Sequence, residues 1–133
     1  MSKASIQGIK HVGVFVRDLE RSINFYQNVL GLKLEERMQV DEQLELAFLS
    51  FSGDKKDTYS QTTLELVHGR DVEAKEGRVN HLAFSVQNID EMLVKLKQHE
   101  VELIDETARE VGDGKMRVAF FRGPDGEKLE LVE

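Results

Sequence analysis

The segment IKHVGVFVRDLERSI, residues 9–23, returns 70 positions later as VNHLAFSVQNIDEML, residues 79–93. The alignment places His11 on His81 and apolar residues on apolar residues along its whole length. In each copy, an alternating run typical of a strand is followed by apolar residues at helical spacing. The chain is therefore predicted to contain two copies of one structural unit.

Each copy continues with three further strand-like runs after its helix. In the first copy, a helix is expected at 19–30 and strands at 9–16, 32–38, 43–51 and 61–68. In the second copy, a helix is expected at 89–99 and strands at 79–86, 101–105, 115–122 and 127–132. Both read β-α-β-β-β, so we expect an α+β fold of two modules, about 8–69 and about 78–133, within a single domain, 1–133.

Polar residues and glycines punctuate these elements. Asp18 precedes the first helix and Asn88 the second, and both residue types are favoured as N-caps. Gly31 follows the first helix, where a glycine commonly ends a helix. The sequence GPDG at 123–126 predicts a turn between the last two strands.

The composition limits the chemistry that the chain can perform. It has 133 residues and no cysteine, so disulfides and thiolate metal sites are excluded, and any metal must be held by His, Asp or Glu. The net charge of -7 comes from scattered acidic residues, which argues against nucleic acid as a partner. No stretch approaches the roughly 20 apolar residues of a membrane span, and no apolar signal segment opens the chain, so we expect a soluble, cytoplasmic protein without a membrane partner.

Two histidines share a face of their strands with small residues. Because side chains alternate across a strand, the valines of HVGVFV lie on one face, and His11 and Gly13 lie on the other. In the second copy, His81 and Ala83 likewise face away from the apolar side. A small neighbour leaves room in front of each imidazole.

Two glutamates stand between leucines in the closing strands of the copies. The tetrapeptide LELV occurs at 64–67 and again within EKLELVE at 127–133, so Glu65 and Glu130 face away from the leucines. If each helix covers the leucine side of its sheet, both glutamates and both histidines project from the uncovered side. A third LEL places Glu45 between leucines, but no repeat partner supports it.

Two imidazoles and two carboxylates are a plausible ligand set for Ni, Co, Zn, Mn or Fe. Four such ligands leave two positions of an octahedral ion open, which favours catalysis over a structural role. Taken singly, a strand histidine is more often solvated than metal-bound, and a glutamate between leucines usually marks only the wet face of a sheet. The metal-site interpretation is favoured for these four residues because one histidine and one glutamate occur at equivalent positions in both copies.

The segments HVGVFVRDLERSINFYQNVLGLKL and GPDGEKLELVE resemble the opening and closing parts of the vicinal oxygen chelate superfamily, which includes glyoxalase I, bleomycin resistance proteins and dioxygenases. The resemblance implies two β-α-β-β-β modules around a metal-binding cleft, commonly in a homodimer. The order of histidines and glutamates is similar to that of bacterial glyoxalase I. It implies that the metal ligands are His11, Glu65, His81 and Glu130.

This resemblance also implies a reaction. In glyoxalase I, a carboxylate removes the C1 proton of a metal-bound hemithioacetal of methylglyoxal and a thiol, and the proton returns to C2 through an enediolate. We expect Glu130 to be the base, with Glu65 as the second choice. One divalent ion is expected, Ni or Zn first, with Co, Mn and Fe left open.

Two positions depart from the glutathione-using members. Those enzymes typically carry Arg where this chain has Phe15, and Asn where it has Gly69. Glutathione is therefore disfavoured as the thiol, and the substrate stays open between a 2-oxoaldehyde adduct of another thiol and an acyl thioester.

Other activities of the superfamily remain as alternatives. Methylmalonyl-CoA epimerase usually has Gln in place of Glu65 and uses a carboxylate on its third strand, near the place of Glu45. A thiol transferase of the fosfomycin-resistance type needs no ligand at Glu65, and extradiol dioxygenases are generally larger. A metal-free drug-sequestering protein tends to lack the ligand set. The sequence does not decide whether one chain or two supply the complete site.

Overall fold

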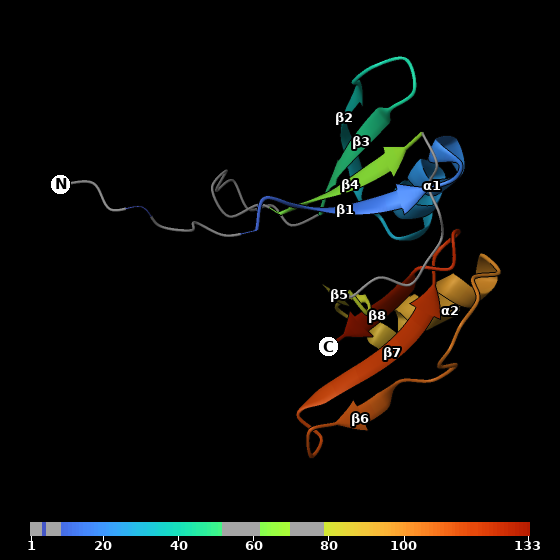
Figure 1. Cartoon of the computed structure of the whole chain (residues 1–133). Helices are drawn as coiled ribbons and strands as arrows, with labels where there is room; N and C mark the ends of the chain where they lie inside the picture. The colour runs from blue at the N-terminus through green and yellow to red at the C-terminus, as the bar shows by residue number, and fades with distance from the viewer. Residues whose placement is uncertain (1–3, 5–8, 52–61, 70–78) are drawn as a thin grey trace. The chain divides into compact units, whose positions relative to one another are not determined.

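The computed structural model describes residues 4, 9–51, 62–69 and 79–133 (Figure 1). The chain divides into two compact units, Met1–Val72 and Glu73–Glu133. This division lies near the boundary expected between the two modules. That the two units make up one domain stays a prediction.

The first unit is a four-stranded sheet with one helical segment. Its elements are β1 (His11–Val16), α1 (Leu19–Asn24), the π-helical turn η1 (Phe25–Val29), β2 (Lys33–Gln39), β3 (Glu45–Ser50) and β4 (Thr63–His68). The strand order is β1-β4-β3-β2, with β1 parallel to β4 and the other pairs antiparallel. The first and last strands of the unit are therefore neighbours.

The second unit repeats this topology. Its elements are β5 (Leu82–Ser85), α2 (Ile89–Gln98), β6 (Arg109–Val111), β7 (Met116–Arg122) and β8 (Lys128–Val132). The strand order is β5-β8-β7-β6, again with the first and last strands parallel. The prediction of an α+β fold built from two β-α-β-β-β modules is confirmed.

Each sheet has one buried face and one open face. In the first unit, Glu65 of β4 lies opposite Gly13 of β1 and Phe48 of β3, so these residues share the open face. The leucines of β4 and β8 are almost fully buried on the other face, as alternation requires. The core comprises Val16, Leu19, Ile23, Phe25, Tyr26, Val29, Leu32, Ala47, Leu49, Leu64 and Leu66 in the first unit, and Ile89, Leu93, Leu96, Val118, Ala119, Phe121, Leu129 and Leu131 in the second.

The first helix is shorter than the predicted 19–30. Its α-helical part ends at Asn24, and one π-helical turn continues to Val29. Phe25, Tyr26 and Val29 of this turn are all buried in the core. Gly31 follows with a positive φ of 83°, as expected of a glycine past a helix end.

The two helices begin with different caps. The Asp18 carboxylate accepts a hydrogen bond from the Arg21 amide at 3.0 Å, so the predicted N-cap is confirmed. Asn88 lies at the N-cap position of α2 as predicted, but it has left-handed dihedral angles and its side chain makes no cap bond. The Glu133 carboxylate takes its place by accepting from the amides of Asn88 and Ile89, at 2.9 and 3.0 Å.

The strand predicted at 101–105 is also wrong. Leu103 makes only an isolated bridge to Phe121, and the edge strand of this sheet is β6 instead. The Asp105 carboxylate accepts a hydrogen bond from the Phe120 amide at 2.9 Å and thereby replaces a backbone acceptor. This side-chain bond ends the ladder and lets the chain turn toward β6.

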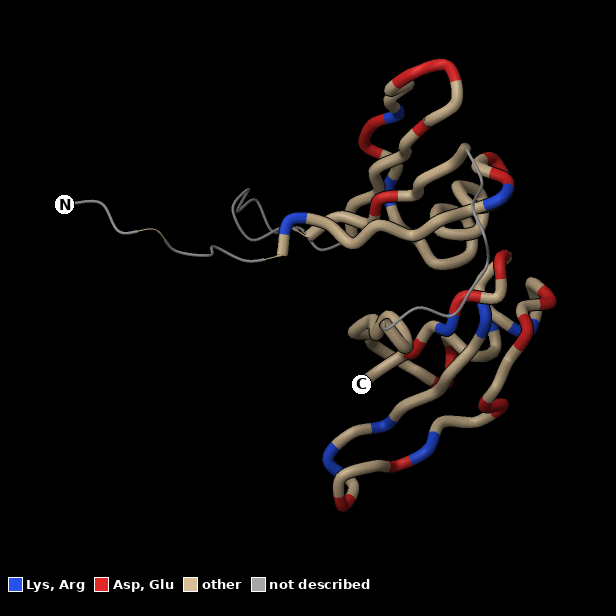
Figure 2. Tube along the Cα trace, viewed as in Figure 1, with Lys and Arg blue, Asp and Glu red and all other residues tan. Residues whose placement is uncertain are grey.

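Charged residues lie in strands as well as in turns (Figure 2), and four of the seven residues of β2 are charged. Basic and acidic positions are interspersed in both units, which matches the scattered charge seen in the sequence. Among the residues that the structure describes, no helix is long and apolar enough to cross a membrane.

Candidate functional site

The first predicted pair, His11 and Glu65, is brought together on the open face of the first unit. His11 begins β1, and Glu65 lies in the parallel neighbour β4. The His11 Nε2 atom is 3.3 Å from Glu65 Oε2. The imidazole is 43% exposed and the carboxylate 16%, so the pair is open to a ligand on one side.

Gly13 provides the space that Glu65 occupies. It lies directly opposite Glu65 in the register of β1 and β4. A Cβ atom at Gly13 would stand 3.4 Å from Glu65 Oε1, which is at the edge of van der Waals contact. A side chain with more atoms would therefore press the carboxylate away from His11.

The second predicted pair repeats this arrangement in the second unit. His81 directly precedes β5, and its Nε2 atom is 3.1 Å from Glu130 Oε1 in β8. The imidazole is 32% exposed and the carboxylate 14%. Ala83 lies opposite Glu130, at the place that Gly13 has in the first unit. The His81 Nδ1 atom is also 2.8 Å from Asn80 Oδ1.

An aromatic ring packs against each imidazole, and sequence reasoning missed both rings. Phe48 lies edge-on to His11 with centroids 6.0 Å apart, and Phe120 lies edge-on to His81 at 5.2 Å. The register of the antiparallel strands places Phe48 opposite Glu65 and Phe120 opposite Glu130. No local motif marks these positions, because only strand pairing reveals them.

The donor atoms of each pair fit a divalent metal ion. Two ligands about 2.1 Å from one ion, at an angle of about 90° to 109°, stand about 3.0 to 3.4 Å apart. The His–Glu separations of 3.3 and 3.1 Å lie in this range. Within the described residues, no three potential ligand side chains gather at one place, so each unit offers two donors of the predicted four.

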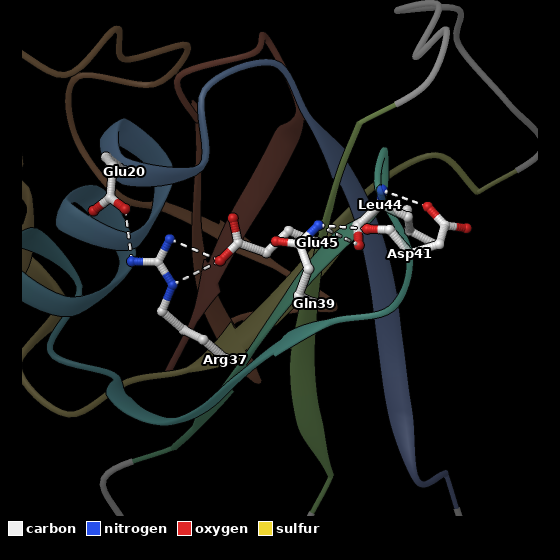
Figure 3. A network of polar contacts seen from close by, with 6 residues as sticks. All are labelled: Glu20, Arg37, Gln39, Asp41, Leu44 and Glu45. Carbon is white, nitrogen blue, oxygen red and sulfur yellow. Dashed lines mark hydrogen bonds and ion pairs between the residues drawn. The ribbon is translucent and has the colours of Figure 1, made fainter.

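Glu45 does not belong to either pair. It lies in β3 three positions before Phe48, and Phe48 faces Glu65, so Glu45 projects from the opposite, buried face of the sheet. There its carboxylate binds the Arg37 guanidinium at 2.9 Å (Figure 3). This position gives no support to an acid/base role for Glu45, because the sheet separates its carboxylate from the His11 side.

Arg37 connects three elements of the first unit. Its guanidinium binds Glu20 of α1 at 2.6 Å as well as Glu45 of β3, as Figure 3 shows. The hydrogen bonds that the guanidinium donates, to Glu20 first and then to Glu45, raise the pKa of Arg37 above its ordinary value. This network ties the helix to the far edge of the sheet and has a structural role.

The two positions at which the sequence departs from the glutathione-using members have different surroundings. Phe15 lies opposite Val67 on the open face and is 63% exposed, so the side chain is free to meet a ligand. Gly69 has a φ of 119°, and a Cβ atom there would collide with the carbonyl oxygen of Gln43. Only glycine fits at that backbone position, which excludes asparagine.

The comparisons with known proteins agree with this architecture. The family model described as "Glyoxalase/Bleomycin resistance protein/Dioxygenase superfamily" matches residues 8–131. The match spans both units and contains all four residues of the two pairs. The chain belongs to this superfamily.

Named relatives narrow the similarity to glyoxalase I-like proteins. A lactoylglutathione lyase of Neisseria meningitidis is 35% identical over 92% of this chain and 88% of its own length. An uncharacterized protein of Bacillus subtilis, YwbC, is 35% identical over 94% and 96%. The solved structure of the trypanothione-dependent glyoxalase I of Leishmania major has a TM-score of 0.73 and 30% identity, covering 94% of this chain and 85% of its own.

Proposed function

We propose that this protein is a metal-dependent lyase of the glyoxalase I type, which isomerises a hemithioacetal of methylglyoxal and a thiol. The observation that carries the proposal is the pairing of one imidazole with one carboxylate on the open face of each unit, at separations of 3.3 and 3.1 Å. The similarity to lactoylglutathione lyases, at about 35% identity, supports the same reaction class.

The proposed metal ligands are His11, Glu65, His81 and Glu130. Imidazole nitrogen and carboxylate oxygen suit Ni and Zn, and also Co, Mn and Fe. When bound, such an ion supplies Lewis acidity toward a carbonyl oxygen and thereby acidifies the neighbouring carbon. The protein's own part is to present the donors with open space beside them, which Gly13 and the partly exposed imidazoles provide.

The proposed proton carrier is Glu130, with Glu65 as the second choice. The Glu130 carboxylate contacts the His81 imidazole through Oε1, and a carboxylate has further lone pairs that can accept a proton. It takes the proton from C1 of the hemithioacetal and returns it to C2, and the product is the isomeric 2-hydroxy thioester. A ligand carboxylate must loosen from the ion to act as a base, so we propose that Glu130 moves during turnover.

We further propose that the thiol is not glutathione. Phe15, exposed on the same face of β1 as His11, offers an apolar contact where the glutathione-using members carry an arginine. Gly69 cannot be replaced by an amide side chain because of its backbone angles. An apolar or uncharged thiol suits this surface better than the anionic tripeptide.

The epimerase alternative has lost its main support in this chain. It required Glu45 as the second acid/base group, but that carboxylate is bound to Arg37 on the other face of the sheet. A homodimer, which the resemblance to the superfamily implies, and a cytoplasmic location, which the sequence led us to expect, remain part of the proposal.

Metal binding provides the first test. The purified chain, freed of metal and titrated with Ni or Zn, is expected to bind about one equivalent. His81→Ala is expected to abolish this binding, and His99→Ala, which alters an exposed histidine at the end of α2, serves as the matched control. If the wild-type chain binds no metal, a metal-free sequestering protein becomes the better description.

The reaction itself provides the second test. The Ni-loaded and Zn-loaded protein is supplied with methylglyoxal and a panel of thiols, glutathione included, and thioester formation is followed. We expect turnover with an apolar or uncharged thiol and little with glutathione. If no thiol supports turnover while a 2-acyl-CoA exchanges its α-proton with deuterated solvent, the epimerase reaction replaces the proposed one.

A further inference from the structure

We infer that Asn80 is a positioning residue that supports His81 for metal binding and makes the second His–Glu pair the stronger of the two. The inference rests on the proposed function, because it concerns the same metal. The Asn80 Oδ1 atom lies 2.8 Å from His81 Nδ1 and so reaches the ring nitrogen that faces away from Glu130.

The chemistry of the two groups favours one state of the ring. An amide oxygen only accepts hydrogen bonds, so Asn80 Oδ1 favours the tautomer in which His81 Nδ1 carries the hydrogen and donates it to Asn80. Without a metal, the Glu130 carboxylate, 3.1 Å from Nε2, favours the opposite tautomer, and an ion bound by Nε2 removes that competition. Asn80 therefore supports the tautomer and orientation in which His81 binds a metal beside Glu130.

The first pair lacks this support. With the repeat offset of 70, the residue that corresponds to Asn80 is Lys10, whose side chain cannot accept a hydrogen bond. Among the described residues, no group bonds the Nδ1 atom of His11. The His11 side chain is also more exposed than that of His81, 43% against 32%, and its contact with glutamate is longer.

A ring that is not held must select its tautomer and rotamer when it binds, and this ordering weakens binding. Hydrogen-bond partners behind a ligand histidine typically change metal affinity by about 10- to 100-fold. We therefore infer that the His81–Glu130 pair takes up the ion more strongly than the His11–Glu65 pair does.

Metal affinity of three variants tests the inference. Zn and Ni affinities are measured by competition with a chelator of known affinity for wild type, Asn80→Ala, Asn80→Asp and Lys10→Ala. Asn80→Ala is expected to weaken binding by about 10- to 100-fold. Asn80→Asp keeps an acceptor and is expected to retain affinity, and Lys10→Ala, the matched change in the first unit, is expected to have no effect.

A second readout needs no metal. In the metal-free protein at alkaline pH, imidazole nitrogen NMR is expected to find a larger share of the His81 ring with its hydrogen on Nδ1 in wild type than in Asn80→Ala, where the Glu130 carboxylate alone favours a hydrogen on Nε2. Unchanged affinity in Asn80→Ala, with a wild type that binds metal, overturns this inference alone. Absence of metal binding by wild type overturns the proposed function, and the NMR result then still decides whether Asn80 holds the ring.

Discussion

The two units place the same three side-chain types in the same register but support them differently. Each has an imidazole, a carboxylate on the neighbouring parallel strand and a phenyl ring on the strand beyond it. The His–Glu contact is 3.3 Å in the first unit and 3.1 Å in the second, and the ring contact shortens from 6.0 to 5.2 Å. The second site is the more closely packed of the two.

The surroundings of the pairs account for this difference. The residue before the histidine is Lys10 in one unit and Asn80 in the other, and the residue opposite the glutamate is Gly13 or Ala83. Lys10 and Gly13 leave space around the histidine and glutamate of the first unit, whereas Asn80 and Ala83 restrict those of the second unit. Two copies of one fold can thus retain the same donors and differ in how firmly each donor is held.

The largest expected effect is on turnover, and it distinguishes the roles of Glu130 and Glu65. In the metal-loaded enzyme, Glu130→Gln is expected to lower turnover by about 10²- to 10⁴-fold because it removes the proposed base. Glu65→Gln removes a ligand but keeps that base, so a smaller loss is expected. Turnover is measured together with bound metal for both variants, and equal losses at equal metal content would contradict the division of roles.

A smaller effect, on stability and metal binding, is expected when the space beside the Glu65 carboxylate is filled. Gly13→Val places methyl groups where a single Cβ already stands 3.4 Å from Glu65 Oε1. Such overpacking is expected to cost about 1–3 kcal/mol in urea unfolding and to weaken metal binding. Gly13→Ala matches Ala83 of the second unit and is the control. A valine variant with unchanged metal affinity would show that Glu65 tolerates displacement.

The smallest expected effect compares the helix caps. Hydrogen bonds from the amides of Ile89 and then Asn88 lower the pKa of Glu133 below its usual value of 4.5. The cap therefore stabilises the fold above that value, and the stabilisation is lost as the pH falls through the lowered pKa. Glu133→Gln is expected to lower the melting temperature at neutral pH and to approach wild type in acid.

Asp18→Ala provides the corresponding change in the first unit. Loss of its bond to the Arg21 amide is expected to cost about 1 kcal/mol. Thermal melts of both variants across pH measure the comparison. A gap between Glu133→Gln and wild type that persists in acid would contradict the carboxylate cap.

Much of the fold could be predicted because its signals are local and occur twice. The strand periods and the repeat offset of 70 predicted the order of elements, and the alternation of His11 with apolar neighbours predicted its open face. The π-helical turn at Phe25–Val29 was not predictable, since its residues also fit an ordinary helix. The strand at 101–105 was misassigned because the Asp105 side chain, in place of a backbone carbonyl, accepts the hydrogen bond from the Phe120 amide.

Alternation along a strand is a local property, and the sequence by itself determined it. It placed Glu65 and Glu130 opposite the buried leucines and associated each with the histidine of its own repeat. Strand register and helix contacts are non-local, and only the tertiary structure decided them. They turned Glu45 toward Arg37, set a phenylalanine beside each histidine and brought Glu133 to the start of α2. One residue of register decides the face on which a side chain lies, and no single segment encodes that pairing.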